Sequence, residues 1–313
     1  MNKPYFKMNI QLHALGAKEQ EYVDVLGGAV QETFELEMQD TADYVSKVFG
    51  VQEIKEERHT VLGTGALGEM EEFDGEIVYE DPNKGYQKTF VQVKYNKGIK
   101  YPIEFATLYG RSKRMEIVDG TGKLTDAAMN TLRTHAVVPF NKGFTTAYAT
   151  PDGKALFATD HKVTPEAADQ SNLFNLELTP SNLSTLRNAM YQFKSDKGAR
   201  LGVSPRMLIV GDDNLDAAIK ICKSENEAYT GNNDANVHKY QKLEYLHLPD
   251  IQGNVWFLAD YKQMMRHHRW IFAQRPKIKQ FVDEDRDLLK YKVTGLWSYG
   301  PTSFHFIAGS DRR

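Results

Sequence analysis

The spacing of hydrophobic residues predicts an amphipathic helix near the start of the chain. Between residues 18 and 50, apolar side chains recur three or four positions apart, with Glu and Asp between them. These apolar positions are Tyr22, Val25, Leu26, Val30, Tyr44, Val45, Val48 and Phe49. Two adjacent glycines, Gly27 and Gly28, favour a weak point or a break, because glycine has a low helix propensity. We expect an amphipathic arm rather than a separate domain.

Two later stretches also have helical spacing. Residues 104–142 predict a helix that is interrupted at Asp119-Gly-Thr-Gly122, and a second helix that begins at Thr125 as its N-cap. Further on, Thr179 and Pro180 combine an N-cap residue with a proline at the first helical position. The predicted buried stripe of that helix is Leu183, Leu186, Met190 and Phe193, and Gly198 is its predicted end.

The region 63–103 predicts a long two-stranded hairpin with one acidic and one basic limb. Residues 69–81 hold seven acidic residues and no basic one. A turn follows at residues 81–85, where Pro82 presets φ and Gly85 permits a positive φ. The return segment alternates apolar and polar positions and carries Lys84, Lys88, Lys94, Lys97 and Lys100. Because a lone hairpin is marginally stable in water, we expect it to lie on another surface.

The second half of the chain mixes short strands with helices. Met207–Val210 predicts a buried strand, followed by a helix over residues 213–224. After an asparagine-rich tract, short apolar or alternating runs predict strands within residues 244–249, 254–260, 269–274, 289–297 and 303–309. These elements lack a regular βαβ rhythm, so the predicted fold class is α+β.

Composition and charge narrow the class of protein. The chain has 313 residues, of which 41% are hydrophobic and 26% charged, enough for one large or two modest cores. A net charge of −3 gives no basic excess that would favour nucleic acid as the principal ligand. A single cysteine, Cys222, excludes an intramolecular disulfide framework and cysteine-rich zinc sites. No signal peptide or membrane-spanning stretch is apparent, so we expect a soluble protein made in a cytoplasm.

One short pattern raises the possibility of a nucleotide site. Gly63-Thr-Gly-Ala-Leu-Gly68 matches G-x-G-x-x-G, the phosphate-binding turn of dinucleotide-binding folds. That turn needs a buried strand before it and a helix after it, whereas a charged run precedes Gly63 here and an acidic run follows Gly68. The acids would also repel a pyrophosphate. We interpret Gly63, Gly65 and Gly68 as a hinge, and a nucleotide-binding enzyme is the minor alternative.

No residues combine into a catalytic or metal-binding set. His267 and His268 are adjacent and would point to opposite faces of a strand, and no HExxH or GxSxG pattern occurs. His161 follows Asp160 in a polar segment that predicts a surface loop. The basic run 262–270 is interpreted as part of a subunit contact rather than a nucleic-acid site. We therefore expect no catalytic, cofactor-binding or metal-binding residue and no cofactor.

The order of these elements resembles the major capsid (head) protein of tailed bacteriophages, which has the Hong Kong 97-type fold. Asp152-Gly-Lys-Ala-Leu-Phe-Ala-Thr-Asp-His161 resembles the D-G-x-x-L-F-x-x-x-H segment of many of these proteins, including Mu-like head subunits. Gly202–Val210 is similar to the family's x-P-x-x-L-(I/V)-V strand, and Tyr291–Pro301 to the closing strands of its peripheral domain. The resemblance covers most of the chain.

The resemblance implies an architecture and a function. The parts would be an N-terminal arm (1–62), an extended loop (63–103), a peripheral domain with a spine helix (104–178 plus 285–313) and an axial domain (179–284). The protein would be a non-enzymatic capsid subunit that assembles through hexamers and pentamers into an icosahedral shell around phage DNA. It would reside in the virion after assembly in the host cytoplasm, without membrane association.

The resemblance also implies contacts and partners. In this family the extended loop lies across a neighbouring subunit, and limbs of opposite charge offer complementary surfaces to such neighbours. The predicted contact residues are Glu69, Glu71, Glu72, Glu76, Lys84, Lys88, Lys94 and Lys97. The arm is short for a built-in scaffold, so we expect a separate scaffolding protein, a portal, decoration proteins and non-specific DNA contact at the inner face. An encapsulin-like nanocompartment shell is the main alternative.

Overall fold

The computed structural model describes residues 19–68, 70, 72, 75, 77, 79–107, 111–226 and 236–312. Contacts divide the chain into two compact units. The first comprises residues 1–39, 96–128 and 277–294, and the second comprises residues 40–95, 129–276 and 295–313. The arm, loop, peripheral and axial boundaries given above follow a different criterion and stay a prediction.

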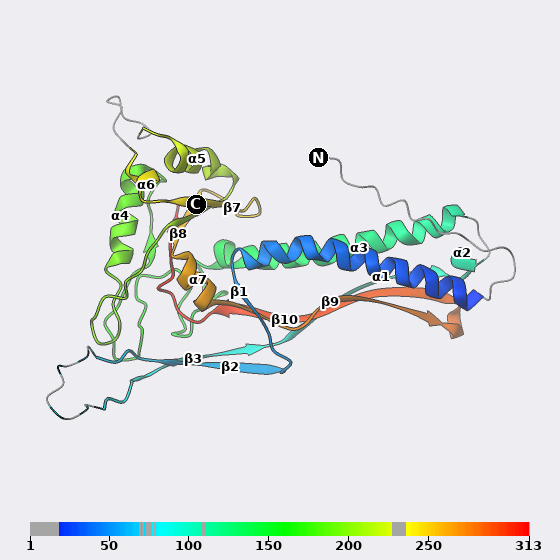
Figure 1. The fold of residues 1–313 in the computed structure, drawn as a ribbon, viewed down its shortest axis with the longest axis horizontal. Coiled ribbons are helices and arrows are strands. Elements are labelled where there is room, and N and C mark those ends of the chain that lie inside the picture. The colour runs from blue at the N-terminus through cyan, green and yellow to red at the C-terminus, as the bar shows by residue number, and fades with distance from the viewer. Residues whose placement is uncertain are drawn as a thin grey trace. The chain divides into compact units, whose positions relative to one another are not determined.

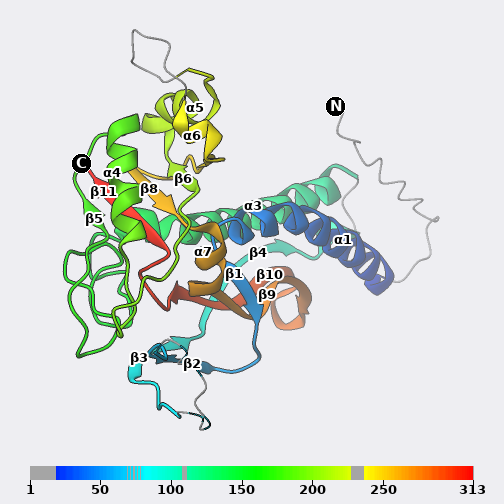
Figure 2. The ribbon, with the colours of Figure 1, turned by 60° about the vertical axis from the view of Figure 1, so that its left-hand side comes forward.

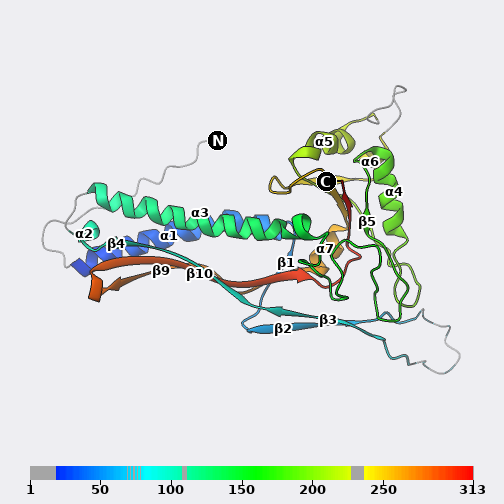
Figure 3. The ribbon, with the colours of Figure 1, turned by 180° about the vertical axis from the view of Figure 1, so that it is seen from behind.

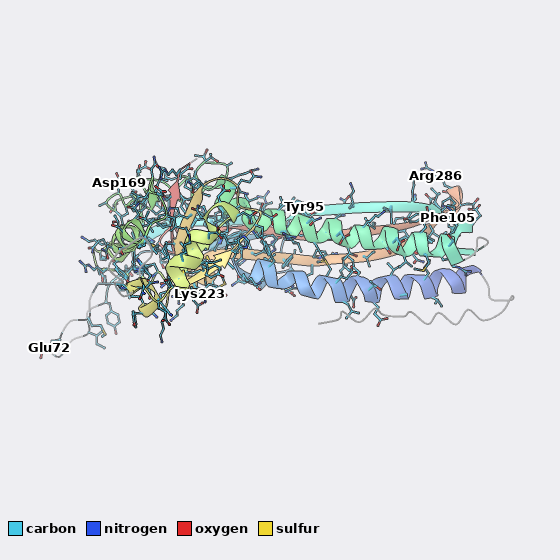
Figure 4. The ribbon with its side chains drawn as sticks, turned by 90° about the horizontal axis from the view of Figure 1, so that it is seen from above. Glu72, Tyr95, Phe105, Asp169, Lys223 and Arg286 are labelled. Atoms are coloured by element: carbon cyan, nitrogen blue, oxygen red, sulfur yellow. The ribbon has the colours of Figure 1, made fainter. Side chains whose placement is uncertain are left out.

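Helices α1 (Glu19–Ser46) and α3 (Arg111–Lys142) pack with residues of β9 (His268–Asp283) and β10 (Leu288–Pro301) in the hydrophobic core of the first unit. Helix α1 lies beside α3, as Figure 4 shows, and the short α2 (Glu104–Thr107) precedes α3. Leu26, Val30 and Phe34 of α1 are spaced four residues apart and are buried against the core. Ile117 and Leu124 of α3 join the same core. Of the apolar positions predicted for this part of the helix, Leu26 and Val30 are buried but Val25 is exposed, so the apolar spacing identifies the buried face of α1 only in part.

Both predicted helix breaks are wrong. Helix α1 continues through Gly27, and α3 continues through Gly120 and Gly122. Packing from other parts of the chain lies against these glycines: a Cβ on Gly120 would meet the Tyr101 ring, and a Cβ on Gly27 would meet the flexible end of the Gln280 side chain. Thr125, predicted as an N-cap, lies inside α3, where its hydroxyl donates to the Thr121 carbonyl oxygen at 3.3 Å.

A four-stranded sheet has the order β1-β9-β10-β4, and its two central strands are the longest. Its members are β1 (Gly50–Glu53), β9 (His268–Asp283), β10 (Leu288–Pro301) and β4 (Val93–Pro102). Strand β1 runs parallel to β9, with Gly50 opposite Arg269. Between β9 and β10 the chain reverses through a helical turn at Glu284–Arg286 and through Asp287, which takes a left-handed φ of 52°. Figure 1 shows β9 followed by β10 in this reversal.

The second unit contains a five-stranded sheet in the order β5-β11-β8-β6-β7. The strands are β5 (Leu173–Phe174), β11 (Ile307–Asp311), β8 (Val255–Ala259), β6 (Met207–Val210) and β7 (Glu244–His247). Helix α4 (Pro180–Tyr191) contacts β8 and β11 (Figure 2), whereas α5 (Leu215–Lys223) contacts β6 and β7. The short α6 (Val237–Tyr240) contacts α5, and α7 (Tyr261–His267) leads into β9.

The predicted start and stripe of α4 are confirmed. Thr179 is its N-cap and accepts a hydrogen bond from the Asn182 amide at 3.2 Å, and Pro180 opens the first turn. The predicted stripe Leu183, Leu186, Met190 and Phe193 is buried. Gly198 is not the helix end, since α4 stops at Tyr191 and Gly198 lies in a later turn with a φ of +83°.

Candidate assembly interface

A hairpin forms, but not between the two limbs predicted within residues 63–103. Strand β2 (Arg58–Thr64) pairs antiparallel with β3 (Lys84–Val91), from Arg58 opposite Val91 to Thr64 opposite Lys84 (Figure 3). Only the β3 part of the basic limb belongs to it, whereas β4 joins the four-stranded sheet. The prediction that the acidic limb 69–81 forms a strand is wrong for the residues described there, which lie in coil or a bend. Clustered like charges disfavour a strand, whereas β2 supplies β-branched residues, and Thr60 hydrogen-bonds across to Thr89 at 3.0 Å.

The loop between β2 and β3 presents apolar side chains to solvent. Leu67, Met70, Ile77 and Tyr79 are 60%, 100%, 67% and 88% exposed. In Figure 4 the side chain of Glu72 lies at the outer end of this loop, away from those of Asp169 and Lys223. Exposed large apolar side chains close together in the chain are typical of interaction surfaces. Three other predicted contact residues, Glu69, Glu71 and Glu76, lie outside the described residues.

The root of this loop is fixed to a turn of the second unit. The Asp196 carboxylate accepts hydrogen bonds from the Ala66 amide at 2.8 Å and from the Asn83 side chain at 2.9 Å. Burial opposes ionisation of Asp196, but these hydrogen bonds outweigh it and lower its pKa. Lys197 forms an ion pair with Glu80, which also accepts from the Gly68 amide at 2.7 Å. We call this set of contacts the root clamp.

The three predicted hinge glycines lie at this root, each in a different setting. Gly63 belongs to β2, where a Cβ would meet the Tyr86 carbonyl oxygen, and a Cβ on Gly65 would meet the Asp196 carboxylate. The Gly68 amide is occupied by Glu80. No helix follows Gly68 in the described part of residues 63–83, so the strand–turn–helix of a dinucleotide site is absent there. The hinge role of these glycines stays a prediction.

The predicted basic contact residues differ in their surroundings. Lys88 is half-buried, its ammonium group donates to the Ala149 carbonyl oxygen at 2.8 Å, and burial lowers its pKa. Lys84 in β3 is exposed, as are Lys94 and Lys97 in β4. Lys88 is therefore engaged within its own chain, and the other three are accessible.

A cleft of about 410 Å³ runs along the hairpin within the second unit. Its lining includes Lys88, Ser195 and His305. Two atoms of residues in this lining, Ser195 Oγ and His305 Nε2, are buried and have no hydrogen-bond partner among the described residues. Burial lowers the pKa of His305 to about 3, so the ring is neutral at neutral pH. The acids of the lining, Asp152 and Asp196, are both engaged with neighbouring groups.

His161 is a buried structural residue, so the prediction of a surface loop histidine is wrong. It is 0% exposed and stacks on Phe304 with ring centroids 4.2 Å apart. Its Nδ1 lies 2.8 Å from the Asp152 carboxylate and its Nε2 lies 3.1 Å from the Leu156 carbonyl oxygen. Burial raises the pKa of Asp152, but hydrogen bonds from His161 and Thr150 outweigh it and bring the value to about 2. The first and last residues of the D-G-x-x-L-F-x-x-x-H segment thus hold it closed.

The adjacent histidines do not share a strand. His267 ends α7 and His268 begins β9. His268 is buried, with Nδ1 3.0 Å from the Val48 carbonyl oxygen and Nε2 2.8 Å from the Tyr148 hydroxyl. Burial lowers the pKa of His268 to about 3. Among the residues that the structure describes, no group of His, Cys, Asp or Glu is arranged to hold a metal ion.

Two polar contacts shape this region, and local patterns in the sequence signal only one of them. Asp196 lies 130 positions from Ala66 along the chain, and only the fold brings the pair together. The Asp152–His161 pair is local, and its signal is the spacing of the motif itself rather than any hydrophobic period.

No helix of the described residues is long and apolar enough to cross a membrane.

The described residues form a mixed helix and sheet fold with an exposed loop between β2 and β3. Residues 90–305 match a family model described as phage capsid protein. This chain belongs to that family. No protein of curated function matches the sequence.

Solved structures confirm the predicted Hong Kong 97-type fold. A virus-like particle from Pyrococcus furiosus is similar at a TM-score of 0.50 and 12% identity, covering 90% of this chain and 100% of that one. The mature capsid of bacteriophage PhiM1 gives a TM-score of 0.51 at 8% identity, with 85% and 86% covered. The capsid of bacteriophage JBD30, decorated with minor capsid protein trimers, gives 0.51 at 14% identity, with 66% and 90% covered.

Proposed function

We propose that this chain is the major capsid subunit of a phage head, and that it assembles through hexamers and pentamers into an icosahedral shell around DNA. Membership of the phage capsid family supports this. The observation that carries the assembly role is the exposed loop between β2 and β3, whose root is clamped while its apolar side chains lack cover. Such a loop finishes its packing only on another surface.

The loop and the basic strands supply the proposed intersubunit contacts. Glu72 on the loop, with Lys84, Lys94 and Lys97, is exposed and carries charge of both signs. Each exposed pair contributes roughly 0–1 kcal/mol, but every copy in a closed shell repeats the contact. Glu69, Glu71 and Glu76 extend the same acidic segment in the sequence. Gly63, Gly65 and Gly68 are proposed to let the loop turn as it meets a neighbour.

The finer parts of the proposal concern partners and place. A separate scaffolding protein, a portal and decoration proteins are proposed, and the decorated JBD30 capsid shows that a shell of related fold carries minor capsid protein trimers. Packaged DNA would touch the inner face without sequence specificity. Assembly would take place in the host cytoplasm, and the role is structural rather than enzymatic.

A nanocompartment shell, the alternative that the resemblance leaves open, is the second candidate, and a virus-like particle from Pyrococcus furiosus has a similar fold. The two candidates differ in what the particle encloses. Particles purified from the natural source should contain nuclease-protected DNA if the chain is a phage capsid protein. A cargo enzyme without DNA would support the nanocompartment instead.

Deletion of the loop tests the assembly role. Removing residues 69–79 spares both strands of the hairpin, and the ends can be rejoined because the Gly68 amide already bonds Glu80. A larger deletion that reached Lys97 would remove β3 and part of β4 and would unfold the subunit. We expect wild-type protein, with its scaffold, to form megadalton particles by sedimentation and electron microscopy, and the variant to stay as folded, soluble subunits. Normal particles from the deletion variant would remove the role given to the loop.

A further inference from the structure

The cleft of about 410 Å³ is shared between the hairpin and the rest of the second unit. Strands β2 and β3 contribute Gly63 and Lys88 to its lining, and residues within 195–203 and 302–305 contribute another part. All of these segments belong to the second unit. A cavity of this size is large enough for a small organic molecule. The exposed residues proposed for intersubunit contact do not line it.

Two polar side chains in the lining lack a partner among the described residues. Ser195 is 8% exposed, and its buried Oγ forms no hydrogen bond there. His305 Nδ1 lies 2.9 Å from the Ser303 hydroxyl, whereas His305 Nε2 is buried and unpaired in the same part of the chain. Ser303 Oγ also accepts from the His305 amide at 3.3 Å, which leaves the hydroxyl hydrogen to donate to Nδ1. The ring hydrogen is then on Nε2, so both unpaired groups are donors.

The charged residues of the lining favour an anion. The two acids, Asp152 and Asp196, already accept hydrogen bonds from neighbouring groups. Lys88 and Arg269 donate only to backbone carbonyl oxygens, and neither forms an ion pair within the described residues. The third cation, Lys162, lies 3.8 Å from an exposed aspartate. A half-buried ammonium group without a carboxylate partner attracts negative charge strongly, because little water screens it.

These features select a class of ligand. Two unpaired donors and two cations without carboxylate partners suit a ligand with negative charge and several acceptor oxygens. A phosphate group has three such oxygens, whereas a carboxylate has two. Apolar side chains also line the cleft, among them Val203 and Leu201, and Leu201 is 37% exposed. The apolar part of the lining suits a ligand with an apolar body attached to the phosphate.

The glycine pattern of residues 63–68 lines the cleft without supplying the phosphate site. The Gly65 amide donates to the Asn83 carbonyl oxygen at 2.7 Å. The Ala66 and Gly68 amides donate to the carboxylates of Asp196 and Glu80. Since these amides are occupied, a phosphate in this cleft must be held by side chains rather than by a glycine-rich turn.

We propose that the cleft binds a small organic phosphate, with Ser195, His305, Lys88 and Arg269 around the phosphate group and Leu201 against the apolar body. Lys88 belongs to β3, whereas Ser195 and His305 come from two other segments. The ligand would therefore connect the hairpin to the rest of the second unit. This proposal goes beyond the shell function, because it adds a small-molecule ligand and does not require an assembled particle.

Calorimetry of unassembled full-length subunits with phenyl phosphate tests the site. We expect wild type to bind one ligand per chain. Ser195→Ala should raise Kd by about tenfold, because a hydrogen bond to a charged group is lost. Arg269→Gln should raise Kd by about threefold, as for a partly exposed charge. Because Ser195 Oγ has no partner in the described subunit, the thermal midpoint of Ser195→Ala without ligand should hold or rise.

Two matched variants outside the lining serve as controls. Ser298 of β10 also has a buried hydroxyl without a partner among the described residues, and Ser298→Ala should bind phenyl phosphate like wild type. Arg275→Gln makes the same charge change as Arg269→Gln on the same strand and should also bind normally. No binding by wild type up to millimolar ligand overturns the proposal. Equal weakening in the cleft and control variants overturns it as well.

Two further probes separate the parts of the ligand. Inorganic phosphate lacks the apolar body and benzoate lacks the phosphate, so each should bind at least tenfold more weakly than phenyl phosphate. If benzoate binds as tightly as phenyl phosphate, the site is a general anion site and the phosphate assignment is wrong. If inorganic phosphate binds as tightly, the apolar body is not recognised and the assignment to an organic phosphate is wrong.

Hydrogen exchange locates the bound ligand. Phenyl phosphate should slow amide exchange in residues 63–66 and 195–203, which border the cleft, and leave α4 unchanged. Slower exchange only in other segments would place the ligand elsewhere and contradict the proposal. Because these measurements use unassembled subunits, their failure leaves the shell function untouched. Failure of wild-type chains to form particles would in turn leave the ligand site untouched.

Discussion

At the residue scale, the Asp152–His161 pair makes a testable contribution to stability. The pKa of Asp152 is lowered from its ordinary value of 3.8 to about 2, so the fold favours the ionised carboxylate. A depressed carboxyl pKa stabilises the protein above pH 4, and this contribution is lost as pH falls through the folded value. We expect Asp152→Asn to lower the free energy of unfolding by roughly 2 kcal/mol at pH 7.

Urea unfolding of both proteins between pH 7 and pH 2.5 checks this. The difference in unfolding free energy between wild type and Asp152→Asn should become smaller as pH falls below 4, because the wild-type Asp152 carboxyl is protonated in that range. Asp169→Asn, at an exposed aspartate of the same region, is the matched control and should change stability by less than about 0.5 kcal/mol. A difference that stays constant with pH would show that the charge of Asp152 is not the cause.

His268 links the fold to pH over a different range. Its pKa falls from an ordinary 6.5 to about 3 because it is buried, and the neutral ring suits both its contacts, to Val48 and Tyr148. The folded state therefore takes up this proton less readily than the unfolded state, and stability declines as pH falls below 6.5. At pH 5 the loss from this one ring is roughly 2 kcal/mol. In His268→Gln, the drop in unfolding free energy between pH 7.5 and pH 5 should be smaller by about that amount.

At the element scale, hydrophobic period predicts buried faces better than helix ends. The apolar spacing places Leu26 and Val30 correctly on the buried face of α1, although it also includes Val25, which is 55% exposed. The prediction of helix breaks is wrong because helix propensity is a local quantity. It does not include the packing of Gln280 against Gly27 or of Tyr101 against Gly120, which comes from other parts of the chain. The prediction that the acidic limb forms a strand is wrong for a related reason, because composition alone does not determine which segment pairs with β3.

Two glycines of α3 give a matched test of that reasoning. Gly120→Ala would push against the Tyr101 ring, whose hydroxyl donates to the Glu116 carbonyl oxygen at 3.3 Å, whereas Gly122→Ala meets nothing within 4 Å. Alanine raises helix propensity equally at both positions. We expect Gly122→Ala to stabilise the protein by roughly 0.5–1 kcal/mol, and Gly120→Ala to destabilise it by roughly 1 kcal/mol. Chemical denaturation measures both, and equal effects would show that Tyr101 yields without cost.

At the scale of the whole molecule, the sequence predicts the class of protein more readily than the details of its interface. Element order and the segment from Asp152 to His161 lead to the capsid fold. The root clamp does not follow from local patterns, because Asp196 meets Ala66 only through tertiary structure. The lysines along β3 and β4 likewise predict basic contact residues. Their sequence does not show that Lys88 bonds within its own chain, whereas Lys94 is exposed to a neighbouring copy.

Lys88 and Lys94 separate folding from assembly on these two strands. Lys88→Met loses the hydrogen bond to the Ala149 carbonyl oxygen, so subunit stability should fall by roughly 1 kcal/mol. Lys94 is exposed, so Lys94→Met should change stability by less than about 0.5 kcal/mol yet reduce particle yield, more strongly at low salt where surface charges act over longer distances. Urea unfolding of isolated subunits and sedimentation of assembly reactions measure the two effects separately. If Lys94→Met assembles like wild type at every ionic strength, Lys94 takes no part in intersubunit contact, and the contact must rest on the other proposed residues and the apolar loop.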